Sequence, residues 1–485
     1  MNSHRPVILL IVIAISFVAA KARAQGETEE EWRHRRDRLI ARLDGARATA
    51  NSFGTGWTSL YQVALPWYQK WGSRDNKPVS QRVTDPETYA DELASALESG
   101  RNFFAEQVGA VIPGWFEVAK DGGRQFSADY LLSVPAGFPA PGRTFPLVIR
   151  LGGSGDIGQK ISFLRGEGSA GPVFSVKPIN QRGYWQIDFL NAFLDDLIRR
   201  LPVDPDRVYL EGHSLGAIAA WQWALENPER FAAIAPRSGW GEPYRASRLA
   251  NVPAWAIHGE GDETVSPVMA ELMISAMREH GAEARYSLLK GVQHNIPNQS
   301  PGFNYQEVLD WYLSHTRSRK PAPADPRDAL KIGAEGVSPV EVMVVPGGRY
   351  WSAPRSDRID AWPRGLRDFK ALYEPMRQGG KLGSGPVRVR FLDPSSQEAA
   401  YLLRVPANVA ATAETGGIDV VQVPERKVAR FYVAGTSPNA DAHLATVRQA
   451  LARDGIATTG EVWITILSVR GFSSRPITEY WLIIE

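Results

Sequence analysis

The chain has 485 residues, of which 44% are hydrophobic, and it carries 55 Lys and Arg against 53 Asp and Glu. A formal net charge of +2 argues against recognition of nucleic acid or of a membrane surface through net charge. The chain contains no cysteine, which excludes disulfide bonds and thiol chemistry. At this length we expect two or three domains.

The first 24 residues have the pattern of a secretory signal peptide. Arg5 precedes an apolar run over residues 7–20, and the small residues Ala22 and Ala24 stand just before Gln25. The run is too short to span a bilayer comfortably. We therefore expect cleavage after Ala24, a secreted or periplasmic mature protein, and no membrane span after cleavage. A retained anchor is the alternative.

Residues 25–110 are predicted to form a mostly helical segment. Thr28 and Glu31 have the spacing of a capping box and open a charged helix. Thr84 and Pro86 mark the start of a second helix, because a capping residue is followed by proline in the first turn. Packing against the next domain explains the aromatic residues of this segment more simply than a glycan cleft does.

Strands alternate with amphipathic helices over residues 111–318. This alternation predicts an α/β domain with a doubly wound, mostly parallel sheet that helices cover on both faces. We expect strands at 115–119, 128–134, 146–151, 208–210, 253–259 and 285–289, and helices at 189–201, 215–225, 266–280 and 305–313. The carboxyl ends of parallel strands meet at one edge of such a sheet, so residues just after them can form a site.

A serine stands at an abrupt change from strand to helix. Residues 208–210 favour a strand and residues 215–225 favour a helix, so Ser214 falls at the turn between them. Gly212 and Gly216 flank it at the spacing Gly-x-Ser-x-Gly, where only glycines relieve the crowding. This is the pattern of a nucleophile elbow, which presents a serine hydroxyl at the top of a sheet and at the start of a helix.

Two partners follow in the order acid, then base. Asp262 comes just after the expected strand 253–259, and His294 lies in the loop after the strand 285–289. A serine hydroxyl is a poor nucleophile at neutral pH, so His294 is expected to take its proton and return it to the leaving group. Asp262 is expected to hold the imidazole in the useful tautomer and to stabilise its cation.

A glycine-rich loop, Gly152 to Asp156, follows the strand 146–151 and can approach a substrate closely. We expect the backbone N–H groups of Ser154 and Leu215 to form the oxyanion hole. Three further residues are candidates for contact with the substrate: Gly153, His213 and Trp185. For His213 a structural role is the alternative, and for Trp185 packing in the core.

These motifs resemble the secreted esterases and "predicted peptidases" related to polyhydroxybutyrate depolymerases and feruloyl esterases. The resemblance covers residues 115–318. It implies an α/β-hydrolase fold and a serine hydrolase acting on esters, with peptides as the alternative substrate. One position departs from the pattern, because Gly152 stands where that family usually has a histidine before the glycine. With glycine at this position we expect the oxyanion loop to be less firmly oriented.

Residues 319–335 are expected to form a linker, because the stretch 318–327 reads SRKPAPADPR and is charged and rich in proline. Beyond it, residues 336–485 contain a weak internal repeat. The stretch 342–346 recurs as 420–424, which is 78 residues later, and each copy continues into a strand, a helix and further strands. Two such ββα halves would make an α+β domain with a pseudo-symmetric curved sheet.

This C-terminal part resembles the SOUL haem-binding and gyrase-inhibitor-like superfamily, in which a duplicated unit holds small molecules. A haem would need a suitably placed histidine, and His443 is the only histidine in this part of the chain. We predict no haem or other cofactor, and a role in packing or in binding a small ligand. We also predict no metal site, since the histidines are scattered without paired ligand spacing.

The sequence thus supports two classes of function. The first is a secreted serine hydrolase that cleaves a small-molecule or polymeric carboxylic ester through Ser214, Asp262 and His294, with peptidase action as the variant. The second is a non-catalytic binding protein that uses the C-terminal cleft.

Overall fold

The computed structural model describes residues 29–73, 86–106, 111–119, 125–140, 142–156, 171–179, 183–334, 336–355, 388–391, 399–404, 419–434, 440–468 and 476–485. Contacts divide the chain into two units. The first unit comprises Met1–Gly183 with Asp188–Pro205, and the second comprises Tyr184–Ile187 with Asp206–Glu485. The expected signal peptide lies outside the described residues.

The N-terminal part of the first unit is helical. Its elements are α2 (Glu29–Gly45), α3 (Arg47–Ser52), α4 (Thr55–Ser73), α5 (Pro86–Glu98) and the 3-10 helix η2 (Phe103–Glu106). Leu43, Leu60, Val63 and Leu97 are buried between these helices, because apolar residues at helical spacing place one face of each helix inward. In the described part of the chain, no helix combines the length and the apolar character that crossing a bilayer requires.

Four strands of the first unit begin the main sheet. They are β1 (Val111–Ala119), β2 (Gln125–Ser133), β3 (Phe145–Leu151) and β4 (Phe174–Pro178). β2 is antiparallel to β1 and to β4, and β3 is parallel to β4. Helix α4 packs against β1, so the helical segment is part of this unit, and the unit also holds most of α6 (Ile187–Arg200). No sequence pattern predicted β4.

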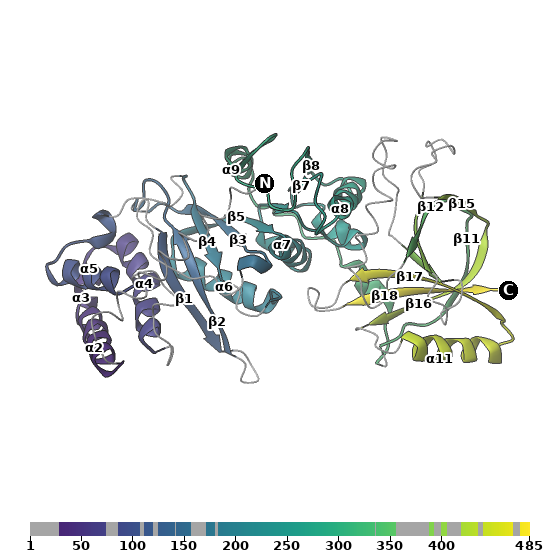
Figure 1. Cartoon of the computed structure of the whole chain (residues 1–485), viewed down its shortest axis with the longest axis horizontal. Helices are drawn as coiled ribbons and strands as arrows, with labels where there is room; N and C mark the ends of the chain where they lie inside the picture. The colour runs from purple at the N-terminus through teal and green to yellow at the C-terminus, as the bar shows by residue number, and fades with distance from the viewer. Residues whose placement is uncertain are drawn as a thin grey trace, which may run out of the picture. The chain divides into compact units, whose positions relative to one another are not determined.

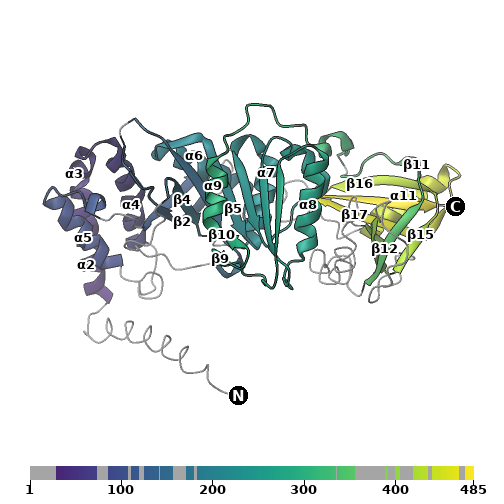
Figure 2. The same cartoon turned by 90° about the horizontal axis from the view of Figure 1, so that it is seen from above.

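The second unit continues with parallel strands and the helices beside them (Figure 2). β5 (Val203–His213) leads into α7 (Leu215–Glu226), and β6 (Ala233–Arg237) and β7 (Ala254–Gly259) follow. After β7 come α8 (Pro267–Glu279), β8 (Ala284–Leu289) and α9 (Tyr305–Leu313). The pairs β5–β6, β6–β7 and β7–β8 are all parallel.

Hydrogen bonds connect eight strands in the order β1-β2-β4-β3-β5-β6-β7-β8. The pairs β1–β2 and β2–β4 are antiparallel, whereas β3–β4, β5–β6, β6–β7 and β7–β8 are parallel. The predicted α/β class with a mostly parallel sheet is therefore confirmed.

The C-terminal part of the second unit contains another eight-stranded sheet, in the order β11-β16-β18-β17-β13-β14-β12-β15. The strands are β11 (Glu341–Val345), β12 (Gly348–Arg355), β13 (Arg388–Phe391), β14 (Ala399–Arg404), β15 (Asp419–Val423), β16 (Arg426–Ala434), β17 (Thr458–Ser468) and β18 (Ile477–Ile484). The order is symmetric, because the first strand of each half pairs with the second strand of the other half: β11 with β16, and β15 with β12.

Alternate residues of these strands face two different cores. Phe431, Tyr480 and Leu482 pack against α11 (Ala440–Arg453), which runs along one face of β16 to β18 (Figure 1). Trp463 and Trp481 point the other way and pack with residues of β12, β14 and β15. The helix that the repeat predicts after its first copy, over residues 364–376, lies outside the described residues.

The expected linker belongs to the second unit and packs against other residues of that unit. It contains the 3-10 helix η6 (Pro326–Leu330), and its Asp325 and Arg327 side chains are buried. Arg245, from the 3-10 helix η5 (Pro243–Leu249), is fully buried and donates to Asp325 at 2.8 Å. Composition predicted a linker here, but it could not show that the charged side chains of Asp325 and Arg327 are paired with buried partners.

Candidate active site

The turn between β5 and α7 is strained as the glycine pattern predicts. Ser214 has φ 54° and ψ −119°, in the region that residues with a side chain rarely occupy. A Cβ on Gly212 would lie 2.1 Å from the carbonyl oxygen of Gly216, so the strand and the helix approach too closely for any other residue. The N–H of Ser214 donates to the carbonyl of Arg237 at 3.0 Å, which ties the turn to the end of β6.

The three residues singled out as nucleophile, acid and base lie together in the second unit. His294 Nε2 is 2.8 Å from Ser214 Oγ, and His294 Nδ1 is 2.8 Å from Asp262 Oδ2. Both are ordinary hydrogen-bond lengths. The Asp262 side chain is fully buried and that of His294 is 19% exposed, so the carboxylate is shielded while the imidazole reaches solvent.

Asp262 receives four hydrogen bonds. The backbone N–H groups of Thr264 and Val265 donate to Oδ1 at 2.9 Å each, and the rings of His294 and His258 contact Oδ2. Burial opposes ionisation of this carboxyl and alone would raise its pKa. The hydrogen bonds from His258, His294 and Val265 outweigh that effect and hold the pKa of Asp262 well below its usual range. The site therefore keeps Asp262 ionised.

The tautomer of His258 follows from its contacts. Its Nε2 lies 3.1 Å from Asp262 Oδ2 and 3.0 Å from the carbonyl oxygen of Val265. A carbonyl oxygen can only accept, so Nε2 carries the hydrogen and shares it between the two oxygens. His258 is fully buried, and its Nδ1 has no partner among the described residues.

The backbone of the His294 loop is also held in place. Its carbonyl accepts from Ser238 Oγ at 2.7 Å and from His213 Nε2 at 3.0 Å. A Cβ on Gly259 would lie 2.3 Å from the carbonyl oxygen of Gln293, so this glycine lets the loop pack on the end of β7. The structure thus places His213, a candidate for substrate contact, on the backbone of His294.

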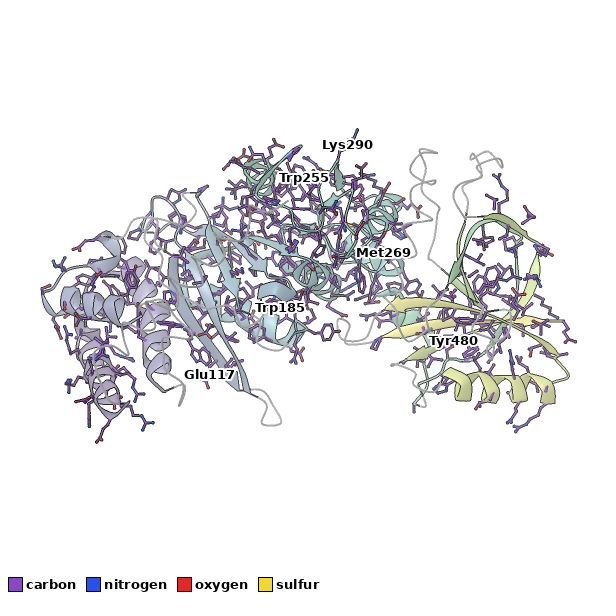
Figure 3. All side chains as sticks on the ribbon, viewed as in Figure 1. Glu117, Trp185, Trp255, Met269, Lys290 and Tyr480 are labelled. Atoms are coloured by element: carbon purple, nitrogen blue, oxygen red, sulfur yellow. The ribbon has the colours of Figure 1, made fainter. Side chains whose placement is uncertain are left out.

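The remaining candidates fall in both units. In the second unit Leu215 is the first residue of α7, and Trp185 is 3% exposed (Figure 3). In the first unit Gly153 is buried after β3, and Ser154 begins the 3-10 helix η3 (Ser154–Asp156) with its side chain exposed. The proposed oxyanion and substrate roles of these four residues stay predictions.

Sequence reasoning missed two residues of this site. His258 carries no motif, although its position four residues before Asp262, across a glycine-containing turn, is the signal that could have found its contact. Ser238 has φ 52° at the end of β6 and carries no motif. Its hydrogen bond to the His294 loop depends on strand order, which local sequence does not reveal.

The strand order and the elbow define an α/β-hydrolase fold. No protein-family model matches the chain. Over 78 residues it is 35% identical to NocK of Nocardia uniformis subsp. tsuyamanensis, a protein named as an esterase. That stretch is 16% of this chain and 23% of NocK, so the chain spans under a quarter of that relative.

Solved structures with a similar architecture include esterases and peptidases. A thermostable esterase aligns with a TM-score of 0.36 and 21% identity, over 44% of this chain and 64% of that one. An acylaminoacyl peptidase of Pyrococcus horikoshii aligns with a TM-score of 0.36 and 14% identity, over 46% of this chain and 44% of that one. The assignment of the fold rests on the topology of this chain itself.

Proposed function

We propose that this protein is a serine hydrolase that cleaves carboxylic esters through Ser214, His294 and Asp262. The observation that carries the proposal is the pair of 2.8 Å contacts that join Ser214 Oγ to His294 and His294 to Asp262. Serine and histidine in hydrogen-bond contact, with the histidine oriented by a third group, are the elements of nucleophilic catalysis.

In the proposed reaction Ser214 Oγ attacks the ester carbonyl carbon while His294 Nε2 takes the hydroxyl proton. The resulting tetrahedral oxyanion collapses, the carbon–oxygen bond to the leaving group breaks, and the imidazolium gives its proton to the departing alkoxide. Water then attacks the acyl-serine with the same base and releases the carboxylic acid. Asp262 stays ionised throughout and stabilises the imidazolium, in keeping with its depressed pKa.

The oxyanion needs hydrogen-bond donors at the elbow. Leu215 is the first residue of α7, and the first N–H groups of a helix have no acceptor within the helix. The N–H of Leu215 is therefore proposed as one donor and that of Ser154 as the second. Gly153, next to Ser154, and Trp185 are proposed to contact the substrate.

The test is hydrolysis of a panel of p-nitrophenyl esters by the purified protein and by Ser214→Ala. We expect turnover by the wild type and a loss of at least about 10³-fold in the variant. Ser247→Ala, a substitution in η5, is the matched control and should keep full activity. Mass spectrometry after treatment with a fluorophosphonate should place the adduct on Ser214. A folded wild type that neither turns over any ester nor takes the label would refute the proposal.

Peptidase action through the same residues is a variant of this proposal. The chemistry differs only in the leaving group, which is an amine that His294 must protonate. A fluorogenic peptide library separates the two, because an esterase would leave it uncut.

A binding protein without catalysis is the second candidate. Its ligand would enter the C-terminal sheet, where the indole Nε1 of Trp481 is buried without a partner among the described residues. The space beside Trp481 measures about 10 Å³, room for about one water molecule. A ligand would therefore have to open this core, and the observation favours a packing role over binding at this place.

The proposal also includes export of the protein and the kind of substrate that it would meet. The signal-peptide pattern of residues 1–24 supports export, so the substrate would be a small or polymeric ester outside the cytoplasm. N-terminal sequencing of protein from the culture supernatant or periplasm should begin at Gln25.

A further inference from the structure

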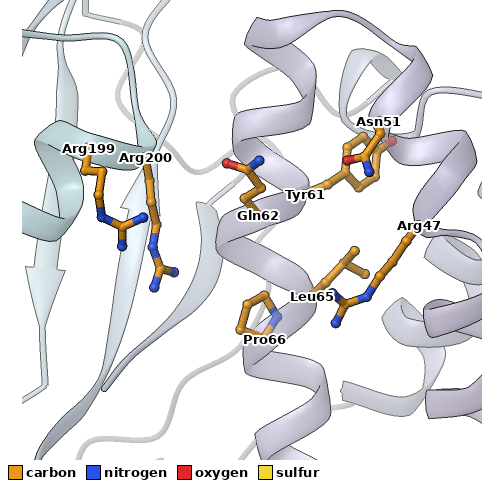
Figure 4. Close-up of a pocket in the computed structure, with 8 residues that line it drawn as sticks. All are labelled: Arg47, Asn51, Tyr61, Gln62, Leu65, Pro66, Arg199 and Arg200. Atoms are coloured by element: carbon orange, nitrogen blue, oxygen red, sulfur yellow. The ribbon is translucent and has the colours of Figure 1, made fainter. Parts of the chain in front are cut away.

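A cavity in the first unit lies on helix α4 and has a volume of about 390 Å³. This is within the range of sites for small organic ligands, about 300–1,000 Å³. Figure 4 shows Arg199 and Arg200 of α6 on the side of α4 where Gln62 and Pro66 lie, with Arg47 on the other flank of α4. The residues that line it are Arg47, Asn51, Tyr61, Gln62, Leu65, Pro66, Arg199 and Arg200.

The lining is cationic. Among the described residues, those that line it supply three guanidinium groups and no carboxylate. The carboxylates that pair with these arginines stand outside the lining: Asp44 contacts Arg47 Nε at 3.2 Å, and Asp196 contacts both Arg199 and Arg200. Three guanidiniums and two carboxylates leave a formal excess of one positive charge, so an anion entering the cavity meets a favourable field.

Each arginine has N–H groups that its aspartate does not use. Arg47 and Arg200 pair through Nε, and Arg199 pairs through Nη2. Neighbouring guanidinium groups suit the two oxygens of a carboxylate.

The opposite wall is mostly apolar. Leu65 and Pro66 face the cavity together with the ring of Tyr61, whose hydroxyl is occupied by its hydrogen bond to Asn102 at 3.1 Å. Two amides, Asn51 and Gln62, complete the lining. A small inorganic anion would leave this wall without contact, whereas a carboxylate attached to a ring or a short acyl body would cover it.

We propose that this cavity binds a small organic carboxylate, with its oxygens on Arg199 and Arg200 and its apolar body over Leu65 and Pro66. Arg47 adds positive charge from the other flank. The proposal does not rest on the proposed esterase chemistry, since the residues that line the cavity include none of those proposed for catalysis or substrate contact.

The test is calorimetric titration of the purified protein at low ionic strength with benzoate, benzyl alcohol and inorganic phosphate. Benzoate should bind, while benzyl alcohol, which lacks the charge, and phosphate, which lacks the apolar body, should bind at least about tenfold more weakly. Added salt should weaken benzoate binding.

Three variants locate the site without disturbing the core. Arg47→Gln and Arg199→Gln change exposed side chains, and Gln62→Glu places a carboxylate in the exposed part of the lining. We expect Arg199→Gln and Gln62→Glu to weaken benzoate about tenfold or more, and Arg47→Gln less. Arg101→Gln, an exposed arginine of the same unit paired with Glu106, is the matched control and should bind as the wild type does.

Two results would overturn the proposal outright: no benzoate binding by the wild type, or binding unchanged in both Arg199→Gln and Gln62→Glu. Phosphate that binds as tightly as benzoate would overturn the assignment of an organic carboxylate. All of these outcomes are independent of ester turnover, so a failure here is distinct from a failure of the proposed enzyme activity.

Discussion

His258 and Asp262 are joined by a hydrogen bond that ends on the same oxygen that orients His294. His258 Nε2 lies 3.1 Å from Asp262 Oδ2, and His294 Nδ1 lies 2.8 Å from it. With the two backbone donors on Oδ1, the carboxylate has little freedom to rotate. His258 does not touch Ser214 in this arrangement, so it is a positioning residue that acts on the base through Asp262.

Replacing His258 should therefore weaken catalysis without removing it. His258→Leu removes one hydrogen bond to a charged group, worth about 1.5–3 kcal/mol, which corresponds to a loss of about 10–100-fold in kcat/KM. We expect the loss in kcat rather than in KM, because His258 acts on the base through Asp262. His258→Gln can keep one N–H near Asp262 and should recover part of the activity. Equal losses in both variants would argue for a general packing defect.

The ionised state of Asp262 predicts a dependence of stability on pH. Its pKa is depressed in the folded protein, so its ionisation contributes stability that is present above the unfolded pKa of about 4 and is lost as the pH falls through the folded pKa. Asp262→Asn should thus unfold more easily than the wild type at pH 7, by about 2 kcal/mol. Urea titrations of both proteins should show this difference shrinking below about pH 4. A constant difference down to pH 3 would contradict the prediction.

Gly212 should be intolerant of a side chain. In Gly212→Ala the new Cβ would meet the Gly216 carbonyl 2.1 Å away, so β5 and α7 must separate and Ser214 must move. We expect a loss of about 3 kcal/mol or more in the free energy of unfolding, together with loss of ester turnover. Gly45→Ala is the control, since nothing lies within 4 Å of its added Cβ at the end of α2. That variant should be neutral or slightly more stable.

The elbow could be predicted because its cause is local. A strand, a helix and two glycines around Ser214 leave few backbone solutions, and the structure has the expected strained φ. The grouping of Asp262 and His294 with Ser214 could also be predicted. Each of the two residues follows an expected strand, and the carboxyl ends of parallel strands lie at one edge of the sheet. The hydrogen bond from Ser238 to the His294 loop could not be predicted, because these residues are 56 positions apart in the chain. The contact between His258 and Asp262 spans only four residues, but no sequence motif marks it.

In the rest of the fold, too, some elements and strand pairings could not be predicted from the sequence. Strand β4 has only five residues, including Lys177 and Pro178, too few for a periodic signal. The repeat at 342–346 and 420–424 indicated two halves of the C-terminal sheet, but the pairing of β11 with β16 exchanges strands between the halves. Long-range pairing of this kind has no signature in a short stretch of sequence.

The last prediction concerns the buried ion pair that joins Arg245 of η5 to Asp325 of the linker. Arg245 is fully buried and donates to Glu242 at 3.1 Å, to Asp325 at 2.8 Å and to the Leu225 carbonyl at 3.2 Å. Arg245→Met would leave Glu242 and Asp325 buried with one cation fewer, and breaking a buried pair from one side costs about 3–5 kcal/mol.

Urea unfolding should show that loss for Arg245→Met, and trypsin should cut the stretch 318–327 faster, because docking of Asp325 is weakened. Arg319→Met, on an arginine that is 76% exposed, should change stability by at most about 0.5 kcal/mol. The double variant Arg245→Met with Asp325→Asn should lose less than the two single variants together, since removing both partners leaves fewer unpaired charges. Strict additivity would show that Arg245 and Asp325 do not stabilise one another.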